Sequence, residues 1–423
     1  MKTKRNTTIF NIGYLFILQA LNFIIPLLLL PYLLKTLGPE KFGIISLAQA
    51  IAAYFTLLVD FGFNLSAVQR IAVNRNNVDE MFRIFWGTMY AKASICVICF
   101  FLNVILIYTV KEFYAIKEVI YIFFSTVIGL AIVPIWFFQG VERVKLVTII
   151  NVTIRILILP LTFIFVKKPG DYYISAIIQS ACIVISGIIS FCFVFRYYPI
   201  KLYRFNIKSI LIEVKESWPV FVSNVAINIY SSSFVIILSF YSSKTAIAYY
   251  STSDKIARAL ASLILLPVTQ AVYPKISYLV TINRAKAIHL FKKTAIVASL
   301  ILLGGCIMLF FFSSIIINFL GASYYNMLPL LKLMSIAPLL ICMGGIFGQA
   351  GLLAFGDKKG FRDIILLCGS VSLVVVLILT MLFKEYGTAI SMIITEFLVL
   401  LLMYRRCLKY ILRPVGSSLT GNL

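Results

Sequence analysis

The chain has 423 residues, of which 61% are hydrophobic and 13% are charged. A soluble domain is roughly half apolar and about a quarter charged, so the composition excludes an ordinary soluble protein. Apolar runs of about 20 residues recur from end to end, which is the length that crosses about 30 Å of hydrocarbon. The formal net charge of +23 would suggest a nucleic-acid partner on a soluble chain. Here the composition predicts an all-α polytopic membrane protein with no nucleic-acid partner.

Twelve apolar runs follow one another along the chain. The first is longer than the apolar region of a signal peptide and has no small-residue cleavage site after it, so we expect it to remain as a span. Gly38-Pro39 predicts the break before the second span, and Pro134 interrupts the fourth. Pro267 and the pair Gly344-Gly345 predict weak points in the eighth and tenth spans. The expected spans lie at 9–34, 42–62, 84–110, 117–139, 146–166, 173–195, 218–241, 245–274, 291–318, 326–355, 363–383 and 387–410.

The basic residues of the loops predict the topology. If the N-terminus is cytoplasmic, 25 of the 38 Lys and Arg residues fall on the cytoplasmic side, 8 on the opposite side and 5 within spans. Positively charged loops stay in the cytoplasm, so this asymmetry predicts that both termini are cytoplasmic. Most of the net charge is therefore interpreted as topological, and only the five cations within spans need another explanation.

The longest basic link, Arg196 to Ser217, divides the chain into two predicted six-helix halves, 1–205 and 206–423. Within it, residues 206–216 have amphipathic helical spacing and are expected on the membrane surface. A faint repeat aligns FGIISLAQAI at 42–51 with IAYYSTSDKI at 247–256, each opening the second span of its half. Such a parallel repeat predicts a central cavity between the halves, with substrate near the midplane of the bilayer.

The eighth expected span, 245–274, carries Asp254, Lys255 and Arg258 near its middle. A charge at bilayer depth costs roughly 2.5–3.5 kcal/mol on insertion scales, so it is normally paired or faces an aqueous cavity. Asp254 and Arg258 are four residues apart, so they share a helical face and can form an ion pair. One interpretation is a buried ion pair with Lys255 left over. The other, which we favour, is a polar cavity wall that binds an anion.

Further charged residues lie inside other expected spans. Arg155 has no acid in its own span, so Glu396 or Asp254 is its expected partner, while Asp60 is expected to serve helix packing. Lys92 is too deep for full snorkelling, and Lys332 lies nearer a helix end. Five cations then face three acids, and such an excess suits an anionic cargo such as a diphosphate. The set is Lys92, Arg155, Lys255, Arg258 and Lys332 against Asp60, Asp254 and Glu396.

The sequence predicts neither a metal site nor catalytic residues. His289 is the only histidine, and neither a His-based metal site nor a Ser-His-Asp triad is predicted from it. Cys96 and Cys99 have CxxC spacing but lie in a hydrophobic span, where cysteine acts as a small apolar residue.

Several stretches together resemble one family, the O-antigen flippases of the Wzx type, in the polysaccharide transporter branch of the superfamily that includes the multidrug and toxin extruders. The twelve-span layout is also similar, so the resemblance covers essentially the whole chain. The stretches are LGPEKFGIISLAQAI at 37–51, LVDFGFNLSAVQRIA at 58–72, PIWFFQGVERVK at 134–145, YSTSDKIARAL at 250–260 and PVTQAVYPKIS at 267–277.

This resemblance implies a function that hydropathy does not show. Members move undecaprenyl-diphosphate-linked oligosaccharide from the cytoplasmic to the periplasmic leaflet of a bacterial inner membrane. It implies that Lys92, Arg155, Lys255, Arg258 and Lys332 meet the diphosphate or acidic sugars. It also implies coupling to H⁺ or Na⁺, with Asp254, Glu396 and Asp60 as candidates and no bound cofactor. Membrane lipids, the O-antigen polymerase and the chain-length regulator are the implied partners.

Alternative functions differ in cargo or in class. A capsule or enterobacterial common antigen intermediate is a second possible cargo. A multidrug extruder would favour an acidic cavity, and a lipid II flippase is expected to have more than twelve spans. A polymerase would carry a large periplasmic loop and a glycosyltransferase a soluble domain with a DxD motif, and the sequence contains neither feature. We therefore expect a flippase for the O-antigen repeat unit and not an enzyme.

Overall fold

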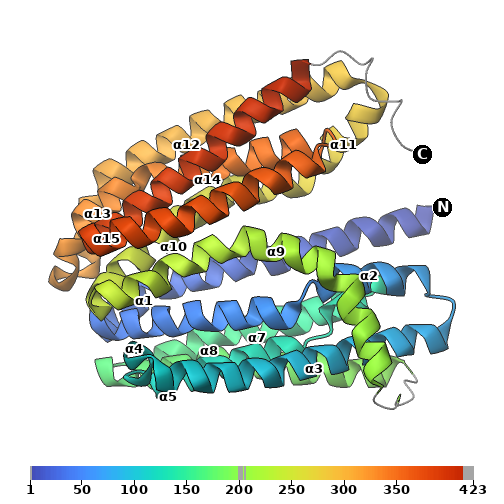
Figure 1. Ribbon diagram of the computed structural model, residues 1–423, viewed down its shortest axis with the longest axis horizontal. Helices are drawn as coiled ribbons and strands as arrows, with labels where there is room; N and C mark the ends of the chain where they lie inside the picture. Colours follow the sequence, from blue (N-terminus) through green and yellow to red (C-terminus); the bar gives the residue numbers. More distant parts are fainter. Residues whose placement is uncertain (1, 199–202, 204–205, 413–423) are drawn as a thin grey trace. The chain divides into compact units, whose positions relative to one another are not determined.

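The computed structural model describes residues 2–198, 203 and 206–412, and their side chains from residue 24 onward except for 223, 224, 226–232 and 410–412. Every regular element in this part of the chain is a helix (Figure 1). Nine stretches among the described residues are long and apolar enough to cross a membrane. The all-α polytopic class is therefore confirmed, whereas the count of twelve spans and their division into halves stay predictions.

The helices group into two compact units that divide between Ser251 and Thr252. The predicted boundary between residues 205 and 206 separates two six-helix halves, which is a different kind of division from a grouping by contacts. It therefore stays a prediction. The first unit contains α1 (Lys2–Asp60), α2 (Phe63–Val73), α3 (Val78–Thr109), α4 (Lys111–Tyr114), α5 (Lys117–Ile132), α6 (Ile135–Gly140), α7 (Val144–Phe165), the short 3-10 helix η1 (Pro169–Asp171), α8 (Tyr172–Tyr197), α9 (Ile207–Tyr241) and the start of α10 (Lys244–Pro267).

Two sequence-predicted breaks are confirmed in this unit. Gly38 interrupts α1 with φ 72° and ψ 170°, a conformation that glycine adopts without steric cost. Val133 and Pro134 separate α5 from α6, because proline cannot donate the backbone hydrogen bond that would continue α5. Each break lies where the sequence placed a Gly or Pro.

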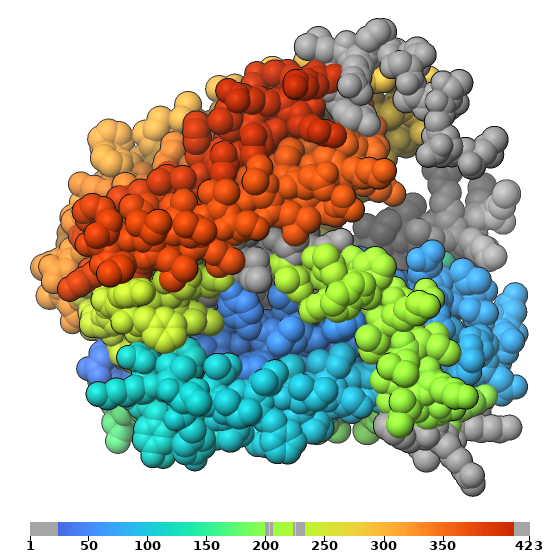
Figure 2. All heavy atoms as spheres, in the orientation of Figure 1, coloured from blue at the N-terminus to red at the C-terminus, as the bar shows by residue number. Residues whose placement is uncertain are grey.

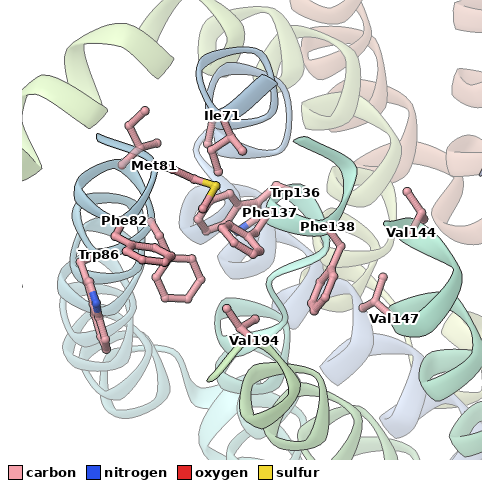
Figure 3. Close-up of a cluster of buried hydrophobic side chains, with 13 residues drawn as sticks. Ile71, Met81, Phe82, Trp86, Trp136, Phe137, Phe138, Val144, Val147 and Val194 are labelled. Atoms are coloured by element: carbon pink, nitrogen blue, oxygen red, sulfur yellow. The ribbon is translucent and has the colours of Figure 1, made fainter. Parts of the chain in front are cut away.

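A cluster of buried hydrophobic side chains, many of them aromatic, packs α6 in the first unit (Figure 3). Trp136, Phe137 and Phe138 of α6 are fully buried, and Phe85 of α3 contacts the first two of them edge-on or tilted. Gly140 ends α6 against α2, where an added Cβ would lie only 2.6 Å from the Cγ2 of Ile71. The short helix that follows Pro134 is therefore held against α3 by ring packing and against α2 by the close approach of Gly140 to Ile71.

Every regular element among the described residues of the second unit is also a helix. Unusual π-helical turns follow Pro267 and Gly345, the positions that predicted weak points. A positive φ of 50° at Lys384 divides α15 into two antiparallel-packed parts. The elements are the rest of α10, η2 (Val268–Val272), α11 (Tyr273–Ile282), α12 (Arg284–Leu320), η3 (Ala322–Met327), α13 (Leu328–Leu333), η4 (Met334–Ile336), α14 (Ala337–Gly345), η5 (Ile346–Leu353) and α15 (Lys358–Leu412).

Buried hydroxyls join the two parts of α15. Thr380 and Thr388 are fully buried, and their hydroxyl oxygens lie 2.9 Å apart. Gly387 lies beside them, where an added Cβ would be 1.8 Å from the carbonyl oxygen of Leu379. The close approach of the two parts therefore requires glycine at this position.

Candidate functional site

The predicted ion pair within α10 is present. The Nε of Arg258 donates to both carboxylate oxygens of Asp254, at 2.9 and 3.0 Å. The Asp254 side chain is 16% exposed and that of Arg258 is 30% exposed. One turn of helix places the two groups on the same face, which is why the spacing of four residues was sufficient to predict the contact.

Two further predicted residues belong to the same group. Glu396 of α15 is 4% exposed and interacts electrostatically with Arg258 and Asp254. Lys255 interacts electrostatically with Asp254. The second unit therefore brings together two cations and two carboxylates from α10 and α15, and their formal charges balance.

In the first unit, Lys92 and Asp60 form an ion pair that the sequence analysis missed. The Nζ of Lys92 lies 3.4 Å from Oδ1 of Asp60, and Lys92 is only 2% exposed. The depth of Lys92 agrees with the expectation that snorkelling is only a partial solution, and the contact joins α1 to α3, as a packing role for Asp60 would. The sequence does contain a signal for this pair, because an acid at the end of one expected span is followed by a lysine deep in the next.

The remaining two predicted cations lie apart from these pairs. Arg155 lies on α7, half-buried, and forms no ion pair among the described residues of the first unit. Its pairing with Glu396 or Asp254 stays a prediction. Lys332 is half-buried on α13, and its Nζ lies 5.6 Å from the ring centroid of Phe310 on α12, a cation–π distance.

The segment expected on the membrane surface is part of α9. Residues 207–216 continue directly into the span, and Glu213 is 3% exposed. Its Oε2 accepts from Nη1 of Arg70 at 2.6 Å and from the hydroxyl of Thr88 at 3.4 Å. Burial raises the pKa of the Glu213 carboxyl above its ordinary value, and Arg70 opposes this effect. The amphipathic pattern is present, but one polar residue of it faces protein.

The second unit has a comparable buried carboxylate outside the span centres. Asp357, 5% exposed, accepts from Nε and Nη2 of Arg406 at 2.6 and 3.2 Å and from the backbone N–H of Gly360 at 3.0 Å. Neither this pair nor Arg70–Glu213 was predicted. In each case the two residues are far apart in sequence, so only the packing of helices brings them together.

The family model described as "Polysaccharide biosynthesis protein" matches residues 9–280, well over half of the chain. The chain belongs to this family. The family assignment is supported by two curated relatives, each named "Putative O-antigen transporter". The Escherichia coli (strain K12) protein is 36% identical over 96% of this chain and 98% of its own length. The Shigella dysenteriae protein is 30% identical over 93% of this chain and 98% of its own length.

Solved structures show the same fold at low sequence identity. A structure named lipid II flippase MurJ in an inward closed conformation has a TM-score of 0.71 at 14% identity and covers 97% of this chain and 89% of its own. An inward-facing multidrug resistance transporter of the MATE family has a TM-score of 0.68 at 11% identity and covers 92% and 98%. This member of the polysaccharide biosynthesis family therefore has the fold of these membrane transporters.

Proposed function

We propose that the protein is a flippase that moves an undecaprenyl-diphosphate-linked oligosaccharide, the O-antigen repeat unit, from the cytoplasmic to the periplasmic leaflet. The observation that carries this proposal is the near full-length similarity to two proteins named as O-antigen transporters. Both names describe transporters, which agrees with the expectation that the chain is not an enzyme. The fold shared with a lipid flippase supports a lipid-linked cargo.

The cations inside the spans provide the chemistry that such a cargo needs. A diphosphate presents several anionic oxygens, which guanidinium and ammonium groups bind by charge-assisted hydrogen bonds. Lys255 and Arg258 lie together on α10, and Arg155 has no ion-pair partner among the described residues of its unit. We propose that these three, with Lys92 and Lys332, form a cationic surface that binds the anionic cargo in an alternating-access cycle.

Coupling to H⁺ or Na⁺ would act through the carboxylates of the second unit. The group of Asp254, Lys255, Arg258 and Glu396 is neutral when all four are charged. Binding of one cation at Glu396 would make the group net positive and strengthen its attraction for an anionic head group. Asp60 would act similarly on Lys92 in the first unit.

The proposed setting is a bacterial inner membrane with both termini in the cytoplasm. The excess of basic residues in the loops assigned to that side supports this orientation. The O-antigen polymerase and the chain-length regulator would then act on the product at the periplasmic face, as proposed partners.

The decisive test is complementation of a deletion strain. We expect loss of the gene to remove one surface polysaccharide and to leave its lipid-linked intermediate on the cytoplasmic leaflet. Wild-type protein should restore the polymer, whereas Arg155→Ala, Lys255→Ala and Arg258→Ala should not at equal protein level. Arg362→Ala is the matched control, because that side chain is 54% exposed. Intermediate on the periplasmic leaflet without polymer would contradict the flippase and indicate a later step.

A further inference from the structure

The first twelve residues of α9, 207–218, form an arm that precedes Pro219 and bends away from the rest of the helix (Figure 1). Asn206 caps the arm by accepting from the backbone N–H of Lys208 at 2.9 Å. Proline inside a helix removes one backbone hydrogen bond and is a common cause of a kink. The arm is therefore a defined helical element with a weak point at its junction with the span.

The arm packs against α2 and α3 (Figure 2), and polar groups make part of this contact. Glu213 pairs with Arg70 of α2 and accepts from Thr88 of α3. One turn further on, the hydroxyl oxygen of Ser217 lies 2.5 Å from that of Ser66. Ser217 is fully buried, so this contact is closed to water in the present conformation.

The junction between α1 and α2 packs against α9 just beyond the hinge, at residues that follow Pro219. The ring of Phe61 stacks on that of Phe221, with centroids 4.2 Å apart and an interplanar angle of 10°. Phe61 and Gly62 both have positive φ, 43° and 79°. An added Cβ on Gly62 would lie 2.9 Å from the backbone nitrogen of Phe221 and from Val220. The backbone of α9 thus rests directly on a left-handed turn that favours glycine.

The chemistry of this contact suits docking that is reversible. A buried ion pair stabilises a helix contact little, because both charges lose their hydration when the helices pack. Apolar residues of similar volume would therefore hold two helices together at least as well. Charged and hydroxyl groups can instead be returned to water without exposing apolar surface. Reversible docking needs a hinge, a contact that can open and a fixed point beside the hinge. Pro219, the polar contact and the turn at Phe61–Gly62 provide these three parts.

We propose that the α9 arm is a cytoplasmic latch, docked on α2 and α3 in this conformation and released during each transport cycle. This inference rests on the proposed transport function. By the sequence prediction α9 opens the second six-helix half, whereas α2 and α3 belong to the first. The contacts of α9 place it with α2 and α3 in the first unit, so in this conformation the arm joins elements on both sides of the predicted boundary between the halves. We infer that separation of the halves on the cytoplasmic side pulls the arm away from Arg70 and Ser66.

The test is a reversible crosslink between Ser66→Cys and Ser217→Cys in a background without the eight native cysteines. Cysteine sulfurs at these positions are within reach of a disulfide, since the hydroxyl oxygens are 2.5 Å apart. We expect oxidation to crosslink the pair and abolish delivery of lipid-linked oligosaccharide to the periplasmic leaflet, and reduction to restore it. Failure to crosslink, or full transport by crosslinked protein, would overturn the latch.

The matched control is a crosslink within the first predicted half, Thr126→Cys with Ser180→Cys. Their hydroxyl oxygens lie 3.1 Å apart between α5 and α8. This crosslink should leave transport unchanged. If the wild-type protein and this control restore no transport, the proposed function fails. If they do and the arm crosslink is harmless, only the latch fails.

A second measurement does not depend on activity. Ser217→Cys alone, in the same background, is treated with a membrane-impermeant maleimide in inside-out vesicles. If the arm undocks, this buried position becomes labelled over time. Ser180→Cys, at a position that is 1% exposed, is the control and should stay unlabelled. Absence of labelling at Ser217→Cys would show a fixed arm and overturn the proposal.

Discussion

Removing the anion from the Lys92–Asp60 pair should cost much more stability than removing the cation. Lys92 is 2% exposed, and the Asp60 side chain is 24% exposed. Asp60→Asn leaves an ammonium group buried without its counter-charge, and loss of one partner of a buried pair costs about 3–5 kcal/mol. The pair is long, at 3.4 Å, and one partner reaches solvent. We therefore expect a loss near the lower bound, about 3 kcal/mol.

Lys92→Met, in contrast, should cost little stability. Methionine fills a similar volume without a charge to desolvate, and the partly exposed Asp60 can remain hydrated. The expected change is within about 1 kcal/mol of the wild type. The double variant Asp60→Asn with Lys92→Met should be close to Lys92→Met alone.

The assay is unfolding of the purified protein in detergent, with the exposed Asp363→Asn as a control. Asp363 is 62% exposed, so its loss should change stability by less than about 1 kcal/mol. Equal destabilisation by Lys92→Met and Asp60→Asn would refute the desolvation argument. Transport by the stable Lys92→Met variant then separates the two roles of the lysine, because a cargo-binding residue should lose transport while stability holds.

The other predictions concern three different regions. Reversal of both charges in the Asp254–Arg258 pair should recover part of the surface polysaccharide lost in each single reversal, and lack of recovery would mean that the two groups act separately. Arg70→Ala should lower the unfolding midpoint because it leaves the Glu213 carboxylate buried without a cation, and adding Glu213→Gln should restore most of the loss. Because burial raises the pKa of Glu213, the folded protein binds that proton more tightly than the unfolded chain does. Its contribution to stability is therefore complete below the ordinary pKa of the acid and is lost as the pH rises through the raised value. The unfolding midpoint of the wild type relative to Glu213→Gln should therefore fall as the pH rises through this range. A rise would contradict this. Gly387→Ala should prevent close packing of the two parts of α15, since the new Cβ would lie 1.8 Å from a backbone oxygen, and an unchanged midpoint would contradict the described contact.

The sequence predicted what depends on local chemistry. Gly38 and Pro134 break helices because of their own backbone limits, so their effect does not depend on distant residues. The Asp254–Arg258 contact follows from the helical repeat alone. The predicted weak points after Pro267 and Gly345 appear as π-helical turns for the same reason.

What the sequence left open depends on packing between distant segments. Lys92 and Asp60 were read as separate residues because nothing local shows that α1 and α3 place them side by side. The amphipathic pattern of 206–216 shows which face is apolar, but it cannot distinguish lipid from protein as the surface that covers that face. For the same reason Glu213, which looked like a surface acid, is buried against Arg70.

The hydroxyl contact between Thr380 and Thr388 has a consequence for how the chain enters the membrane. Each hydroxyl is fully buried, and in hydrocarbon an unpaired hydroxyl is costly. The two parts of α15 are joined by a single sharp turn at Lys384, so they can meet as soon as both have been synthesised. This geometry lets the last two helical passages pair with each other before they pack against the rest of the second unit. The order of synthesis would then protect the polar groups before the rest of the second unit closes around them.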